Sequence, residues 1–128
     1  MHIDRLDHLV LTVADIDRTV RFYCDVLGME ATVFGAGRTA LRFGWSKMNL
    51  HQAGSELQPN ALRAVAGSAD LCFITDDPLD QVQEELKENG VPLVEGPVQR
   101  TGARGVLHSV YVRDPDGNLV EISNYLWR

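Results

Sequence analysis

Four side chains that can bind a divalent metal ion recur at related places in the chain: His8, His51, Asp70 and Glu121. Two imidazoles and two carboxylates form a mixed nitrogen and oxygen donor set that suits a divalent transition metal, and the two negative charges would offset the charge of the ion. A site with coordination positions left over for substrate could polarise substrate oxygens. We therefore treat these four residues as candidate metal ligands.

These candidates belong to a repeated unit. A shift of 62 positions superimposes three pairs of residues: His8 and Asp70, Asp15 and Asp77, and Gly28 and Gly90. Each copy then predicts a strand followed by a helix, with an aspartate as the N-cap of the helix and a glycine at its C-terminal end. Two short segments, 48–51 and 118–121, match later in the copies, which makes His51 the expected counterpart of Glu121.

The first copy predicts one strand, one helix and three further short strands. The strands are expected at residues 6–13, 30–34, 39–43 and 47–52, with the helix between Asp15 and Gly28. The first strand alternates only weakly between apolar and polar residues, which is typical of a strand covered on both faces. Turn formers separate the later strands, which favours an antiparallel meander.

The second copy predicts the same order of elements. We expect strands at 70–75, 106–113 and 118–125, a helix that starts at Asp77-Pro78 and ends at Asn89-Gly90, and a loop at 96–105. The fold class is therefore α+β, with two βαβββ modules at about residues 4–53 and 68–126 that form a cupped, mostly antiparallel sheet. A linker at 54–67, with one helical turn near 61–65, joins the modules in a single domain.

Strand alternation predicts where the candidate ligands point. In the segment 47–52, Met48 and Leu50 would pack on a helix, which leaves Asn49 and His51 on the opposite face. The same alternation places the other three candidates on the helix-free face of their own strands. A lone histidine or acid in a strand is more often a hydrogen-bonded or solvated residue, and Asp70 could simply cap a turn. The shared face is what favours a common site.

Other polar residues allow two readings each. Ser109, Tyr111 and Arg113 share one face of the strand at 106–113 and could line a substrate site or be solvated. Arg100 and Arg104 in the predicted loop could bind an anionic substrate or remain solvated charges. The turn at 114–117 is explained by its own turn chemistry, and we assign no function to His2 or His108.

Composition narrows the function classes. A chain of 128 residues with a net charge of -6 is the size of one domain and is a poor match for nucleic-acid backbones or anionic membranes. The N-terminus lacks a basic-then-apolar signal pattern and no apolar run spans a bilayer, so we expect a cytoplasmic protein. Cys24 and Cys72 form no known motif, and we expect two buried free thiols.

Three stretches carry a family resemblance: residues 6–8, residues 22–29 and residues 114–121. Together they resemble the vicinal oxygen chelate superfamily of glyoxalases, bleomycin-resistance proteins and extradiol dioxygenases. Residues 43–44, 49–51 and 95–102 look closer still to the branch that holds glyoxalase domain-containing protein 5 and bacterial virulence-associated relatives. The resemblance implies metal ligands on the first, fourth, fifth and eighth strands, which here are His8, His51, Asp70 and Glu121. Lactoylglutathione lyases usually have glutamate at the position of His51 and histidine at that of Asp70.

The function that this resemblance implies is a glyoxalase-like, metal-dependent enzyme, a lyase, isomerase or related activity. It would act on a small molecule with vicinal oxygens through metal-stabilised anion chemistry, with Zn, Ni, Mn, Fe or Co as the ion. Glu121 would be both ligand and general base, and Tyr111 would donate a hydrogen bond. The alternatives are a metal-free protein that binds a small molecule or an antibiotic, as in the bleomycin-resistance branch, and a partner-binding scaffold.

The resemblance also implies a homodimer. Three aromatic residues could form a partner surface, line a substrate cup or pack in the core: Phe43, Trp45 and Trp127.

Overall fold

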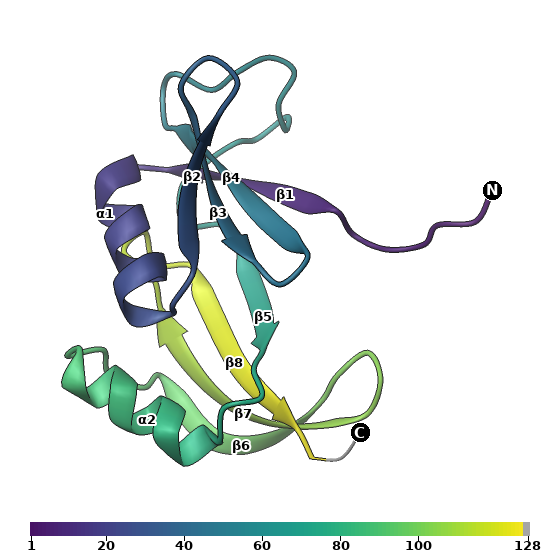
Figure 1. Ribbon diagram of the computed structural model, residues 1–128, viewed down its shortest axis with the longest axis vertical. Helices are drawn as coiled ribbons and strands as arrows, with labels where there is room; N and C mark the ends of the chain where they lie inside the picture. Colours follow the sequence, from purple (N-terminus) through teal and green to yellow (C-terminus); the bar gives the residue numbers. More distant parts are fainter. Residues whose placement is uncertain (127–128) are drawn as a thin grey trace. The chain divides into compact units, whose positions relative to one another are not determined.

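The computed structural model describes residues 1–126 and shows two compact units that divide between Gly67 and Ser68. Each unit holds one four-stranded mixed sheet and one helical segment (Figure 1). In each sheet the first strand runs parallel to its neighbour, and the other two pairings are antiparallel. The predicted α+β class and the βαβββ order of both units are therefore confirmed.

The first unit contains six elements in the order strand, helix, π-helix and three strands. Their bounds are β1 His8–Val13, α1 Ile16–Arg21, η1 Phe22–Val26, β2 Glu30–Phe34, β3 Arg38–Phe43 and β4 Ser46–Gln52. The sheet order is β1-β4-β3-β2, so β1 and β2 are its edges. The core of this unit consists of apolar side chains that are almost fully buried: Leu11, Val13, Tyr23, Ala40, Leu41, Met48 and Leu50.

The predicted first helix has the expected ends and an unexpected interior. The Asp15 carboxylate accepts a hydrogen bond from the Arg18 backbone N–H at 3.0 Å, which caps α1. The helix then widens into the π-helix η1 instead of continuing as one regular α-helix. Gly28, with φ of 75°, ends it as predicted, because glycine reaches this left-handed conformation without strain.

The second unit contains five elements. Their bounds are β5 Asp70–Ile74, α2 Leu79–Glu88, β6 Glu95–Thr101, β7 Val106–Arg113 and β8 Leu119–Tyr125, and the sheet order is β5-β8-β7-β6. The predicted apolar stripe of α2 is confirmed, because Leu79, Val82 and Leu86 are buried. We expected Pro78 to be the first helical residue, but it is the N-cap of α2, so the helix begins one residue later than predicted.

Strand β6 corrects the predicted loop at 96–105. Only residues 102–105 form the connection to β7, closed by a 2.8 Å hydrogen bond from the Gly102 N–H to the Gly105 carbonyl oxygen. Gly96 and Pro97 imitate a loop signal, but they occupy an irregularity in the β6–β7 pairing between Glu95 and Val98. An edge strand tolerates proline at such a point because the missing N–H would have no partner.

The segment between the units is irregular. It runs from the end of β4 to the start of β5 with turns and bends, and the helical turn expected near 61–65 is absent from this described stretch. The predicted turn at 114–117 is present, and Gly117 has a φ of 86°. Its Asp114 carboxylate accepts hydrogen bonds from the backbone N–H groups of Asp116 and Asn118 at 2.9 and 3.0 Å. Turn chemistry therefore accounts for this motif, as expected.

Two expectations from composition have different outcomes. Cys24 and Cys72 are free thiols as expected, but Cys72 is exposed and Cys24 is only half-buried, so the expectation that both are buried is wrong. Within residues 1–126, no helix is long and apolar enough to cross a membrane.

Candidate functional site

The first sheet has one face toward α1 and one away from it. The Gln52 amide accepts a hydrogen bond from the Ile16 N–H and donates one to the Ala14 carbonyl, so the face of β4 that carries Gln52 meets the start of α1. Strand pairing places six residues on the opposite face, which we call the distal face of the first sheet: His8, Val10, Thr12, Lys47, Asn49 and His51.

The second sheet is arranged in the same way. The Asn124 amide donates to the carbonyl oxygens of Thr75 and Asp77, just before α2, so this face of β8 meets the start of the helix. The distal face of the second sheet carries the following polar residues of β5, β8 and β7: Asp70, Cys72, Glu121, Ser123, Tyr125, Ser109, Tyr111 and Arg113. The alternation predicted for the candidate ligands agrees with both sets of strand pairs.

Glu121 is held by two buried hydroxyl groups. Ser109 Oγ donates to Glu121 Oε2 at 2.6 Å, and Ser123 Oγ lies 3.2 Å from the same oxygen. The two serine oxygens are 2.6 Å apart and fully buried, and Cys72 Sγ lies 3.5 Å from Ser123 Oγ. Hydrogen bonds to one carboxylate oxygen fix the orientation of the group. The sequence did not predict this role for Ser123.

Tyr111 lies directly opposite Glu121 in the β7–β8 pairing and is bound to Arg100 on β6. Arg100 Nε donates to the Tyr111 hydroxyl at 3.0 Å, Nη1 donates to the Gln99 carbonyl at 3.0 Å, and Nη2 donates to Glu95 Oε1 at 3.1 Å. Arg100 is therefore a strand residue that orients Tyr111. Burial raises the pKa of the Tyr111 hydroxyl although Arg100 acts in the opposite direction, so the group is protonated near neutral pH.

Arg104 is exposed in the turn between β6 and β7, where its backbone N–H donates to the Tyr125 hydroxyl at 3.2 Å.

His8 presents one ring nitrogen to a neighbouring carboxylate. His8 Nδ1 lies 2.8 Å from Asp7 Oδ2. This contact lowers the pKa of the Asp7 carboxyl. A carboxylate on one ring nitrogen fixes the ring orientation and directs the other nitrogen, Nε2, toward a ligand. His8 is therefore oriented in a way that is common for metal-binding histidines.

The strand registers correct the assumed correspondence between the two units. His8 lies opposite Lys47 in β4, whereas its counterpart Asp70 lies opposite Leu119 in β8. On this register, Glu121 corresponds to Asn49 rather than to His51. The matching amide contacts of Gln52 and Asn124 with the starts of their helices support the same register.

The correction separates His51 from the other candidates. His51 pairs with Thr12, four residues along β1 from His8, or about 13 Å at ~3.3 Å per residue. Two histidines on one ion both place a nitrogen about 2.0–2.1 Å from it, so this register does not favour His8 and His51 as neighbouring ligands. His51 corresponds instead to Ser123. The sequence suggested the wrong match because the segments 48–51 and 118–121 look alike, although the first lies near the end of β4 and the second at the start of β8.

Asn49 and His51 are buried polar residues with unpaired atoms. Asn49 is 4% exposed and His51 is 7% exposed. Asn49 Oδ1 and both ring nitrogens of His51 have no hydrogen-bond partner among residues 1–126. A buried polar atom without a partner is unfavourable, and native proteins keep few of them. These two side chains are therefore candidates for contact with a bound ligand.

The structure brings together only part of the predicted set. Within residues 1–126, no group of three or more His, Cys, Asp or Glu side chains converges on one point. In the second unit, Asp70 and Glu121 lie on adjacent strands of one face, two positions apart in register. In the first unit, His8 and Asn49 have the equivalent relationship.

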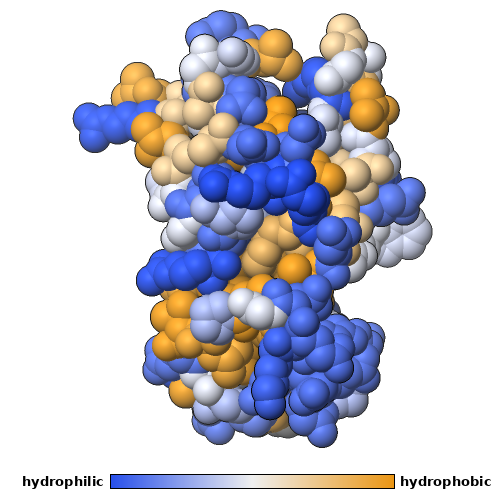
Figure 2. Space-filling model, turned by 90° about the vertical axis from the view of Figure 1, so that its left-hand side faces the viewer, coloured by the Kyte–Doolittle hydropathy of each residue, from blue (hydrophilic) through white to orange (hydrophobic). Residues whose placement is uncertain are grey.

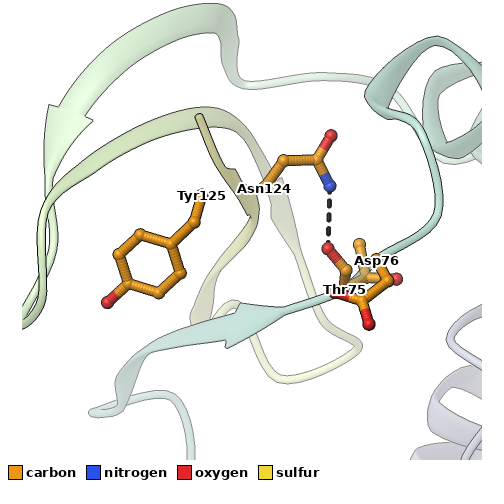
Figure 3. Close-up of a pocket in the computed structure, with 4 residues that line it drawn as sticks. All are labelled: Thr75, Asp76, Asn124 and Tyr125. Atoms are coloured by element: carbon orange, nitrogen blue, oxygen red, sulfur yellow. Dashed lines mark hydrogen bonds between the residues drawn. The ribbon is translucent and has the colours of Figure 1, made fainter. Parts of the chain in front are cut away.

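A small pocket lies at the end of β8 in the second unit. It has a volume of about 240 Å³ and is lined by Thr75, Asp76, Asn124 and Tyr125 (Figure 3). The Asn124 amide in its wall is already bound to the Thr75 carbonyl at 2.8 Å. The polar groups of this pocket thus join β8 to the chain before α2, and none of the predicted site residues lines it.

Comparison with known proteins places this arrangement in a family. Residues 5–122 match the model of the Glyoxalase/Bleomycin resistance protein/Dioxygenase superfamily. The chain belongs to this superfamily. Virulence protein STM3117 of Salmonella typhimurium is 57% identical over 126 residues, which cover 98% of this chain and 88% of the relative. The crystal structure of that protein matches with a TM-score of 0.97 over 98% of this chain and 100% of the other.

More distant superfamily members have named activities. Lactoylglutathione lyase from Agrobacterium tumefaciens is 25% identical with a TM-score of 0.74, over 98% of each chain. Metallothiol transferase FosB from Shouchella clausii is 27% identical over 125 residues, which cover 94% of this chain and 80% of the relative. The predicted vicinal oxygen chelate fold is thereby confirmed, with its two βαβββ units built on one sheet each.

Proposed function

We propose that this superfamily member is a metal-dependent enzyme that acts on a small molecule with two neighbouring oxygens. The observation that carries the proposal is the Glu121 carboxylate, held at Oε2 by Ser109 and placed opposite Tyr111 on one sheet face. An oriented carboxylate beside a protonated phenol is suited to moving a proton at a substrate carbon or oxygen. The reaction class is a lyase, an isomerase or a related one.

The donor chemistry of the distal faces fits a divalent ion. Glu121 and Asp70 offer carboxylate oxygens two register positions apart, and His8 offers Nε2 while Asp7 holds Nδ1. Asn49 adds an amide oxygen that has no hydrogen-bond partner among residues 1–126. Nitrogen and oxygen donors of this kind suit Zn, Ni, Mn, Fe or Co. We propose that His8, Asp70 and Glu121 hold the ion, with Asn49 as a fourth donor in place of His51.

The bound ion would supply a positive charge that stabilises the negative charge developing on the substrate oxygens. The chain itself supplies the proton chemistry. Glu121 accepts a proton, while Ser109 keeps its Oε2 in place throughout. Tyr111 can donate a hydrogen bond, because its hydroxyl accepts from Arg100 Nε and its raised pKa keeps it protonated. Arg100 and Ser109 therefore orient these two groups.

Metal titration of the metal-free protein tests this proposal. Calorimetry with each of the five ions should show one specific site. Glu121→Ala, Asp70→Ala and His8→Ala should each weaken binding by at least about tenfold, because even residues that only orient a ligand change affinity 10- to 100-fold. Glu84→Ala in α2 and His108→Ala in β7 are matched controls, because both residues are exposed and lie outside the two distal faces.

Two results would contradict the proposal. One is that none of the five ions binds stoichiometrically. The other is that the site variants and the control variants lose the same amount of metal affinity. Either result would favour the metal-free alternative, a protein that binds a small molecule or an antibiotic. A screen of compounds with vicinal oxygens, with the ion that binds best, then identifies the reaction.

A homodimer is part of the proposal. The Trp45 side chain is 99% exposed, and several other large apolar side chains are exposed as well. Apolar patches interrupt the hydrophilic surface in Figure 2. Aromatic residues are enriched in protein interfaces, so Trp45 is suited to a contact with a second copy. Light scattering coupled to size exclusion measures the mass, and Trp45→Ser should shift it toward the monomer. Phe43 is half-buried, and Trp127 lies outside the described residues.

A further inference from the structure

We propose that the distal face of the first sheet binds an anionic group, a carboxylate or a phosphate, of the small molecule on which the enzyme acts. The inference deepens the proposed function by naming a substrate class, and it rests on that function for the identity of the reacting end. Its evidence lies entirely in the first unit.

Two cations face each other across neighbouring strands. Arg42 of β3 and Lys47 of β4 are direct partners in an antiparallel pairing, and therefore lie on the same face of the sheet. Like charges in directly opposite positions destabilise a sheet. On its other side Lys47 pairs with His8 of β1, the proposed metal ligand. The cations thus begin next to one of the proposed metal ligands.

A third cation shares an aromatic ring with Lys47. Lys47 Nζ lies 3.7 Å from the centroid of the Phe34 ring, and Arg38 Cζ lies 4.6 Å from the same centroid. Arg38 and Phe34 are direct partners in the β2–β3 pairing. Cation–π contacts hold both side chains in place without neutralising their charge. Phe34 therefore acts as an apolar support that brings two positive groups together.

Carboxylates of the described chain form no salt bridge with these cations, although the charge of Lys47 is felt by the nearby Asp7 carboxylate. Within residues 1–126, neither Arg38, Arg42 nor Lys47 forms an ion pair. Glu30 lies opposite Arg42 on β2 without pairing with it, and Asp7 is hydrogen-bonded to His8. Three cations without a salt bridge to any described residue therefore share one face of a chain whose net charge is -6. A local positive field of this kind attracts an anion even when the whole protein is acidic.

His51 provides a second, independent indication of a ligand. It lies on the same face of β4 as Lys47, is 7% exposed, and has two unpartnered ring nitrogens among residues 1–126. An imidazole buried in this way needs a polar partner, which a bound ligand can supply. Arginine and lysine bind carboxylates and phosphates, and an imidazole N–H donates to the same oxygens. An anion is the ligand chemistry that suits both the cations and an imidazole N–H donor.

Three compounds with the same glycerol skeleton test the inference. Glycerate carries a carboxylate, glycerol 3-phosphate carries a phosphate, and glycerol carries no charge, while all three have vicinal oxygens. Each is titrated into the ¹⁵N-labelled full chain without metal, and the amide shifts of β3 and β4 are followed by NMR. We expect saturable shifts with one or both anions and none with glycerol over the same concentrations. The stronger anion identifies the preferred group.

Variants assign the effect to the three cations. Arg38→Gln, Arg42→Gln and Lys47→Gln should each weaken anion binding about three- to fivefold, the range expected for partly exposed charge pairs. Lys47→Arg keeps the charge and should retain binding. Arg21→Gln, at the exposed end of α1, is the matched control and should bind as the unmodified chain does. Amide spectra of every variant establish that it is folded.

Three results would overturn the inference: no anion-induced shifts in β3 and β4, equal shifts with glycerol, or charge variants that titrate like Arg21→Gln. Metal titration of the same variants keeps the two proposals separate. Arg42→Gln and Lys47→Gln should bind metal normally, whereas Glu121→Ala should lose metal and retain anion binding. If the unmodified chain binds no metal but binds anions through the three cations, only the proposed function is contradicted. If it binds metal but anion binding does not depend on the three cations, only the anion site is contradicted.

Discussion

The Ser109 hydroxyl lies 2.6 Å from Glu121 Oε2, and both groups are on the distal face of the second sheet. Ser109 is fully buried and also lies 2.6 Å from Ser123 Oγ. Ser109 donates to Glu121, which leaves the single Ser123 proton to be donated either to Ser109 or to the same carboxylate oxygen. Ser109 is therefore the residue through which the sheet interior orients the carboxylate.

Ser109→Ala should remove this orientation and destabilise the protein. Hydrogen bonds to charged groups contribute about 1.5–3 kcal/mol, and the buried Ser123 hydroxyl would lose a partner as well. We expect a loss of roughly 1–3 kcal/mol in the free energy of unfolding, measured by urea denaturation. Ser55→Ala, in the exposed segment after β4, is the control. Equal stability of the two variants would show that the Ser109 bond contributes nothing.

Asn118→Ala should disturb the turn before β8 and the start of β5 together. The buried Asn118 side chain donates to Asp114 Oδ2 at 2.7 Å and accepts from the Ala69 N–H at 2.8 Å. Loss of both hydrogen bonds should lower the free energy of unfolding by about 2–4 kcal/mol, since it leaves buried partners unsatisfied. Urea denaturation measures the loss, and hydrogen exchange should accelerate at the Ala69 amide.

The control for the turn variant is Asn60→Ala. Its side chain donates one exposed hydrogen bond, to the Leu57 carbonyl at 3.1 Å. Surface changes of this kind usually alter stability by less than about 0.5 kcal/mol. A similar loss in both variants, or an unchanged exchange rate at Ala69, would contradict the role given to Asn118.

Cys72 should be an unreactive thiol at neutral pH despite its exposure. The residue is exposed as a whole, but partial burial of its sulfur beside Ser123 raises the pKa of this thiol above its ordinary value of 9.0, although the Ser123 contact itself acts in the opposite direction. The thiolate is the reactive form, so alkylation by iodoacetamide in a Cys24→Ser background should be slow at pH 7–8 and accelerate only above pH 9.0. Rapid alkylation at pH 7 would refute this prediction.

The same pKa shift has a consequence for stability. A raised pKa means that the folded chain holds the thiol proton more tightly than the unfolded chain. The protonated Cys72 thiol makes its full contribution to the free energy of unfolding below pH 9.0, and this contribution is lost as the pH rises through the folded-state pKa. Cys72→Ser should therefore show a smaller alkaline loss of stability than the unmodified protein, as measured by urea denaturation from pH 8 upward.

Gly96→Ala should be far more damaging than Gly37→Ala. Both glycines have positive φ, 111° and 81°. A Cβ atom at Gly96 would lie 2.6 Å from the Ser109 carbonyl oxygen, whereas none of the described atoms lies within 4 Å of one at Gly37. Gly37→Ala should lower the free energy of unfolding by about 1–2 kcal/mol, from backbone strain alone. Gly96→Ala should lower it by at least about 2 kcal/mol more, because the added Cβ atom also clashes with β7. Equal thermal midpoints would contradict the close packing of β6 on β7.

Local sequence patterns were sufficient for most of the elements. Asp15 as a cap, Gly28 and Gly90 as stops, and the buried stripe of α2 are properties of neighbouring residues, and they are found where expected. The edge strand β6 was missed because Gly96 and Pro97 are read locally as a loop. Its pairing with β7 depends on hydrogen bonds to a distant strand, which no local pattern encodes.

The sequence by itself determined the repeat and the faces of the strands, because side chains alternate with a fixed period along any strand. It therefore placed Glu121 on the helix-free face of its strand and put Ser109 and Tyr111 on a shared face of theirs, whereas the β7–β8 pairing brought the three residues onto one face. The structure decided which residues are neighbours across strands. The register between β1 and β4 makes Asn49 the counterpart of Glu121, moves His51 away from His8, and sets Arg42 against Lys47. Register depends on backbone bonds between strands far apart in the chain, so only the folded protein contains it.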